Sequence, residues 1–169
     1  MNAPARPPSN VIECHDAHLY YLCDRMRADE IEQFLALAGL DRYDPQFAAR
    51  NFAVKPGHKF TVLQRDGLPA ASGGYEEVAP GVWQSWMVGT DAGWAEQWRS
   101  ITKATRWLME GLLDLGARRL QTNCLASRTR TIEWYQRGLG LEPEGIWRKF
   151  ASNGADVACF ARVRADHGQ

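Results

Sequence analysis

The chain has 169 residues, of which 45% are hydrophobic and 24% charged, values close to those of an average globular domain. The 20 Lys and Arg residues balance the 20 Asp and Glu residues, which speaks against a general nucleic-acid-binding or membrane-surface protein, since both depend on basic excess. No apolar run approaches the length of a transmembrane helix. The sequence therefore predicts one soluble domain with room for a proper core.

The cysteines and the N-terminal residues carry little functional signal. Residues 1–17 are predicted to be a flexible arm, because the first ten contain three prolines and little that could pack. Residues 165–169 are predicted to be a tail. Cys14, His15 and His18 form a C-H-x-x-H pattern, but the second cysteine pair of a structural zinc site is missing, so we expect no metal. The four scattered cysteines are typical of reduced thiols in a cytosolic chain.

The first third of the chain predicts a strand followed by two short helices. Residues 18–23 suit a first strand, and residues 29–35 open an amphipathic helix with acidic residues early and Gly39 at its end. A second short helix is expected near residues 46–52.

A hairpin is predicted next. Residues 60–63 and 68–76 read as two strands joined by a turn at residues 65–67. Gly73 and Gly74 inside the return strand predict a bulge or a close approach of another backbone.

The middle of the chain predicts a strand that leads into a long helix. Residues 82–88 are rich in aromatic and β-branched side chains, and residues 89–93 form a turn. The helix that follows has an apolar face at 3/4/7 spacing and ends at Gly116. This face consists of Trp98, Ile101, Thr105, Leu108, Leu112 and Leu115.

The last part predicts a strand at residues 119–124 and a helix at residues 129–137 that Gly138 ends. A hairpin of residues 144–150 and 156–163 closes the domain, with its turn at Asn153-Gly154. This mixed order predicts a layered α/β (α+β) domain with one twisted sheet, over residues 18–164.

The order of elements resembles the GNAT acyltransferase fold, in which a mixed, mostly antiparallel twisted sheet is flanked by helices. The resemblance covers residues 18–164. Within it, residues 129–141 are similar to the GNAT stretch in which a Tyr precedes a Gly-aromatic step. One extra residue is inserted here, and Leu141 stands where the aromatic residue is usual.

Three short runs resemble a narrower group, the GNAT-like proteins of tailed bacteriophages. These runs are residues 25–32, 66–74 and 86–91. The group includes a small internal virion protein of short-tailed phages. The resemblance implies a virion or assembly protein as partner, and a location in the cytoplasm of a bacterial host or in the virion.

An acyl-CoA enzyme of the GNAT fold holds a pyrophosphate where its long helix begins, because free N–H groups and the helix dipole favour an anion there. The usual signature resembles Arg/Gln-x-x-Gly-x-Gly/Ala. Residues 90–96 offer one glycine, two acidic residues and a bulky Trp94 instead. We therefore interpret Thr90 or Asp91 as a helix cap and Trp94 as a packing residue. The resemblance nevertheless implies a set of candidate cofactor contacts around this turn, at Val88, Thr90, Ala92 and Gly93.

Cations on the long helix are the alternative phosphate ligands. Arg99, Lys103 and Arg106 fall at i, i+4 and i+7 and share one helix face. They could grip the phosphates of CoA, dock an acidic partner, or be solvated, which is the commonest fate of such a stripe. The Asn that the family often has early in the next helix is replaced by Arg128 or Ser127.

The resemblance also implies catalytic positions. Tyr135 matches the position of the GNAT general acid for the departing thiolate, although a packing role beside Trp134 is the simpler interpretation. Glu76 and Glu77 are candidate bases beside the expected acyl groove.

Other catalytic chemistry has weaker support. Cys124 would need a distant partner such as His58 to act as a nucleophile. The chain has no Gly-x-Ser-x-Gly elbow, no P-loop and no His-Glu-x-x-His motif.

Two functions follow. The first is a phage-type, GNAT-like virion or assembly component with a degenerate cofactor loop that binds no acetyl-CoA. The alternative is an N-acetyltransferase that uses acetyl-CoA on a small-molecule or protein amine, with a divergent phosphate loop. The acidic, crowded turn at residues 90–96 favours the first.

Overall fold

The computed structural model describes residues 6–165, so residues 1–5 of the predicted arm and 166–169 of the predicted tail lie outside it. Its helices are α1 (Asp16–Asp24), α2 (Ala28–Ala38), α3 (Pro45–Ala53), α4 (Asp91–Asp114) and α5 (Thr129–Glu133), which continues into the π-helix η1 (Trp134–Gly138). Its strands are β1 (Val11–Glu13), β2 (His58–Leu63), β3 (Pro69–Ala79), β4 (Val82–Gly89), β5 (Arg119–Leu125), β6 (Glu142–Trp147) and β7 (Val157–Val163).

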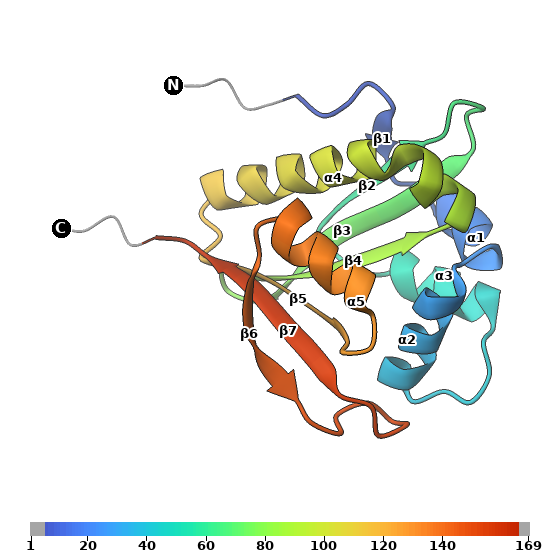
Figure 1. Cartoon of the computed structure of the whole chain (residues 1–169). Coiled ribbons are helices and arrows are strands. Elements are labelled where there is room, and N and C mark those ends of the chain that lie inside the picture. The colour runs from blue at the N-terminus through green and yellow to red at the C-terminus, as the bar shows by residue number, and fades with distance from the viewer. Residues whose placement is uncertain (1–5, 166–169) are drawn as a thin grey trace.

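The strands form one seven-stranded sheet in the order β1-β2-β3-β4-β5-β7-β6. Every neighbouring pair is antiparallel except β4 and β5, which are parallel. The predicted mixed, mostly antiparallel sheet flanked by helices is confirmed (Figure 1). Across residues 6–165, none of the helices has the length and apolarity that crossing a membrane demands.

The two faces of the sheet carry different helices. The long helix α4 and the turn η1 pack on one face, where Ile101, Leu108 and Tyr135 join side chains of β2, β3 and β5. On the other face, α1 and α3 pack against Trp86 and Val88 of β4. Helix α2 also lies on that side, where Ala36 packs near the ends of β5 and β7.

The N-terminal region differs from the prediction. Residues 18–23 are not a strand but part of helix α1. Leu19, Leu22 and Cys23 are its buried residues, and their i, i+3, i+4 spacing is that of one helix face. The first strand is β1, which pairs with β2 from within the predicted arm. A six-residue apolar segment fits both periods, and burial against α3 decides for the helix.

The predicted end of helix α4 is confirmed, whereas its predicted apolar face is only partly right. Gly116 does follow the helix in a left-handed conformation, with φ +105°. However, Trp98 and Leu115, which were placed on the apolar face, are 48% and 79% exposed. The buried face instead includes Ala104 and Met109.

The close approach expected at Gly73 and Gly74 is confirmed, whereas no bulge occurs there. Both glycines pair in register with β4. A Cβ on Gly74 would collide with the backbone carbonyl of His58 on the neighbouring strand.

Strands β4 and β5 separate soon after they begin. They pair only from Val82 with Arg119 to Gln84 with Gln121. Beyond this point a hydrogen bond of 2.6 Å between the hydroxyls of Ser85 and Thr122 still joins the two strands. After Ser85 the strands no longer pair, and the sheet is open between them.

Candidate functional site

A cavity of about 860 Å³ passes through this opening, which is within the usual size of a small-molecule site. On the α4/α5 side its walls include the exposed residues Ala95, Trp98 and Arg130. On the α2/α3 side they include the exposed residues Leu37 and Asn51. The cavity therefore connects both faces of the sheet, so that two ligands could meet in the gap from opposite sides.

The edge of β4 in the gap offers free backbone groups. The N–H of Thr90 donates to Ala70 of β3, at 3.1 Å, whereas the N–H of Gly89 donates to Glu30 of α2, at 2.9 Å. Because successive N–H groups of a strand point to opposite sides, the N–H of Met87 points into the gap. No β5 residue is in register with it, so it can donate to a ligand carbonyl.

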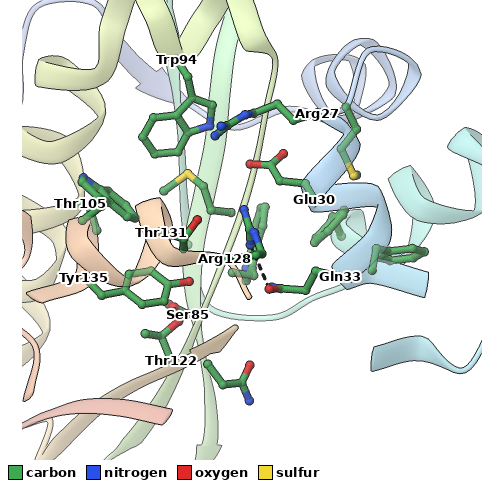
Figure 2. Close-up of a pocket in the computed structure, with 18 of the residues that line it drawn as sticks. Arg27, Glu30, Gln33, Ser85, Trp94, Thr105, Thr122, Arg128, Thr131 and Tyr135 are labelled. Carbon is green, nitrogen blue, oxygen red and sulfur yellow. Dashed lines mark hydrogen bonds between the residues drawn. The ribbon is translucent and has the colours of Figure 1, made fainter. Parts of the chain in front are cut away.

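Tyr135, the predicted general acid, lies in the gap, and its catalytic role stays a prediction. It is 8% exposed and lines the cavity, and its hydroxyl lies near the Ser85–Thr122 pair (Figure 2). Burial raises the pKa of the phenol to about 12, with the Thr122 hydroxyl lowering it in part. The hydroxyl thus keeps its proton at neutral pH and can donate a hydrogen bond.

The position of Tyr135 depends on η1, because that residue lies within the π turn. A π turn contains one residue more than an α turn. The extra residue expected in residues 129–141 is thereby accommodated.

Arg128 crosses the gap between α5 and α2. Its side chain is 9% exposed, and its guanidinium donates to Asp29 at 3.0 Å and to Gln33 at 2.9 Å (Figure 2). Gln33 also accepts from the N–H of Leu125 at 3.0 Å. Arg128 therefore lines the cavity, whereas Ser127 is exposed outside its walls. Which of the two replaces the family's Asn stays a prediction.

Glu30 also lies in the gap, although it was not among the site residues predicted from the sequence. It is 6% exposed and lines the cavity. Burial raises its pKa to about 7, opposed by the Gly89 N–H and by the Arg128 and Arg27 charges. Its spacing to Phe34 and Leu37, at i+4 and i+7, places an acid on an apolar helix face, and this was the available signal.

The turn that enters α4 is short and capped. Only Thr90 separates β4 from the helix, and its hydroxyl already accepts the N–H of Gly93 at 2.9 Å. Gly93 packs so tightly that an added Cβ would lie 2.5 Å from the Ala70 Cα. These contacts confirm Thr90 as the helix cap, and they leave Gly93 no space for a side chain.

Trp94 fills the space beside this turn. Its ring packs edge-on against Trp134 with centroids 5.1 Å apart, and the guanidinium of Arg27 lies 5.5 Å from its centroid. Arg27 in turn pairs with Asp91 at 3.3 Å. Trp94 is thus a packing residue, as predicted, whereas Asp91 and Ala92 stay exposed at the start of α4.

The remaining predicted cofactor contacts lie away from the cavity walls. Val88 is buried against α1 and α3, and Ala92 is exposed in the first turn of α4. Arg99, Lys103 and Arg106 are also exposed, and none of the three lines the cavity. The Arg99 guanidinium stacks on Trp98 at 4.6 Å.

The two predicted bases form other contacts, and the candidate nucleophile Cys124 is buried. Glu76 pairs with Lys55 at 2.7 Å, and Glu77 accepts the N–H of Gly81 at 2.7 Å; neither lines the cavity. Cys124 is buried, and burial raises its pKa to about 11.

His58 is exposed and stacks on Trp83. It lies on β2, which the sheet order separates from the β5 of Cys124 by two strands, so the hypothetical pairing is wrong. No group of three His, Cys, Asp or Glu side chains between residues 6 and 165 is placed to hold a metal ion.

Comparison with known proteins places this architecture. The sequence matches no protein-family model and no curated protein sequence. The structure, in contrast, is similar to GNAT-family proteins. A GNAT acetyltransferase from Bacillus anthracis has a TM-score of 0.68 at 12% identity, over 90% of this chain and 93% of its own.

Two further solved structures agree. A GNAT phosphinothricin acetyltransferase from Sinorhizobium meliloti, in complex with AcCoA, has a TM-score of 0.67 at 14% identity, over 92% of this chain and 88% of its own. The ribosomal-protein-S18-alanine N-acetyltransferase from Escherichia coli has a TM-score of 0.66 at 17% identity, over 94% and 96%. The chain therefore has the GNAT fold.

The two ends of an acyl-CoA fit this chain differently. The gap with the Met87 N–H and the Tyr135 hydroxyl suits an acyl thioester. The first turn of α4 suits a diphosphate less well, because the N–H of Gly93 is already bound to Thr90 and the exposed carboxylate of Asp91 adds negative charge there.

Proposed function

We propose that the protein is an N-acyltransferase that transfers an acyl group from a thioester, with acetyl-CoA as the first donor to test, to an amine. The observation that carries this proposal is the cavity through the β4–β5 opening, which joins both faces of the sheet beside Tyr135. The GNAT fold supports it as well.

A bound acyl thioester would supply a carbonyl carbon to which a neutral amine nitrogen adds. The C–S bond then breaks, sulfur leaves with the electron pair as a thiolate, and the acylated nitrogen releases one proton to solvent in the open cavity. The N–H of Met87 is the donor for the carbonyl oxygen, since it has no strand partner in register. The hydroxyl of Tyr135 donates to the sulfur. With a pKa of about 12, against about 8.5 for an ordinary thiol, the phenol stabilises the thiolate mainly as a hydrogen-bond donor.

The capped turn at α4 sharpens the test. If the diphosphate adds little binding, acetyl-CoA and the truncated donor S-acetyl-N-acetylcysteamine should bind with dissociation constants within about tenfold, or roughly 1.4 kcal/mol. Isothermal titration measures both constants, and mass spectrometry of an amine panel detects transfer. Absence of binding and of transfer with both donors up to millimolar concentration would refute the proposal.

Tyr135→Phe tests the role of the hydroxyl, with Tyr20→Phe as the control because Tyr20 is 41% exposed and lies outside the cavity walls. We expect Tyr135→Phe to lower kcat by about 100-fold, with donor affinity unchanged within a factor of about two. An unchanged kcat would remove Tyr135 from the mechanism.

The virion or assembly role rests on the sequence resemblance alone. No contact between described residues favours it, and none of the solved structures named above is a virion protein. Virion partners and location in a host cell or virion stay predictions.

A further inference from the structure

Helix α2 presents one face to the cavity. Arg27, Glu30, Phe34 and Leu37 all line it, and their spacing places them along one side of the helix. The face is charged at its N-terminal half and apolar in its C-terminal half. Such a wall suits a ligand that is charged at one end and apolar at the other.

The carboxylate of Glu30 has no ionic partner among residues 6–165. The two neighbouring guanidiniums form their ion pairs with other acids: Arg128 pairs with Asp29 at 2.9 Å, and Arg27 pairs with Asp91 at 3.3 Å. One oxygen of Glu30 accepts the Gly89 N–H, and the other has no hydrogen-bond partner in the described chain. A buried charge left in this state is costly unless a cation compensates it.

Aromatic side chains form the neighbouring wall. Phe34 and Phe52 have ring centroids 5.9 Å apart, and Phe52 and Trp86 have theirs 5.1 Å apart. All three line the same cavity as Glu30. This wall offers apolar burial to a flat or branched body.

The distance to the gap fits an acceptor. Gly89, which binds Glu30, follows Met87 by two residues along β4, so the two N–H groups are roughly 6–7 Å apart. A carbonyl held by Met87 would thus lie within reach of an amine held by Glu30. Figure 2 shows the Glu30 side chain pointing into the space between Trp94 and Arg128.

We propose that Glu30, Phe34, Phe52 and Trp86 form the acceptor subsite, and that it takes a primary amine carried on an aromatic or bulky apolar body. The term acceptor rests on the proposed acyl transfer. The binding of the amine does not, because it can be measured with no acyl donor present.

The experiment is isothermal titration at pH 8 with 2-phenylethylamine and three relatives: butylamine, which lacks the ring, and 2-phenylethanol and 3-phenylpropanoate, which lack the cation. We expect 2-phenylethylamine to bind at least tenfold more tightly than each relative. Equal binding of 3-phenylpropanoate or 2-phenylethanol would overturn the ionic part of the proposal, and equal binding of butylamine would overturn the aromatic part. These comparisons use the unaltered protein.

Glu30→Gln adds a second readout, with Glu32→Gln as its matched control, since Glu32 is exposed on the same helix and lies outside the cavity walls. We expect Glu30→Gln to weaken 2-phenylethylamine binding at least tenfold and Glu32→Gln to leave it unchanged. Unchanged binding in both variants would refute the role of Glu30. Amine binding without acyl transfer would support the subsite and contradict the proposed function. Acyl transfer to amines whose binding does not depend on Glu30 would support the proposed function and contradict the subsite.

Discussion

Glu30 should make the stability of the protein depend on pH in an unusual direction. An acid whose folded pKa is raised stabilises the fold only while it is protonated. Below its unfolded pKa of 4.5 the residue is protonated in both states, so burial adds no ionic penalty. As the pH rises to about 7 the unfolded chain loses this proton while the folded chain retains it, and stability falls.

The separation between the two pKa values corresponds to about 3 kcal/mol. The pKa of Asp29 is below its ordinary value because the charges of Arg128 and Arg27 together outweigh its burial. Because Glu30 is half ionised in the folded protein at its pKa of about 7, the loss should level off about one pH unit above that value.

The assay is urea unfolding followed by tryptophan fluorescence at several pH values from 4.5 to 8, for the unaltered protein, Glu30→Gln and Glu32→Gln. Glu30→Gln should gain about 3 kcal/mol relative to the unaltered protein as the pH rises across this range, whereas Glu32→Gln should show a constant difference. A flat difference for Glu30→Gln would mean that the carboxyl is not buried as described. A difference of the opposite sign would mean that its pKa is lowered.

Two further predictions concern packing. Gly93→Ala should destabilise the protein by about 1–3 kcal/mol, because its Cβ would lie 2.5 Å from the backbone of Ala70. In the same helix, the added Cβ of Gly111→Ala meets nothing within 4 Å, so this variant should be more stable by about 0.5–1 kcal/mol. Urea unfolding of both variants measures the two changes, and equal effects would contradict the tight contact at Gly93. Iodoacetamide at pH 8 should alkylate the half-exposed Cys14 well before Cys124, whose pKa burial raises to about 11. Peptide mass spectrometry measures the order, and early labelling of Cys124 would contradict its burial.

The parts of the fold that sequence predicted best are those in which one pattern runs long. Helix α4 has 24 residues, enough turns for its apolar period to be unambiguous. Residues 18–23 had too few, and strand and helix periods fit them equally well. Their helical state is decided by packing against α3, about thirty residues later in the chain. The local sequence of residues 18–23 does not reveal this contact.

The candidate site divides in the same way. The location of Tyr135 in the cavity and the packing of Trp94 could be predicted, because each stands at a fixed place in a family pattern. Glu30 had only a weak signal, an acid on an apolar helix face, and the N–H of Met87 had none, because its freedom comes from the separation of β4 and β5. That separation is a property of strand pairing, and nothing in either strand sequence marks where pairing stops.

A single helix links the two unusual features of the site. Helix α2 begins at the end of β4, where Gly89 accepts the N–H of Arg27 at 3.3 Å and donates its own N–H to Glu30. The side chain of Arg27 then reaches Asp91 and Trp94 in the first turn of α4. The segment that holds Glu30 in the gap therefore also contacts the start of α4, where the proposed donor would bind. An amine that binds Glu30 and a donor that displaces Arg27 would act on the same few hydrogen bonds, so occupancy of one side of the sheet should alter affinity on the other.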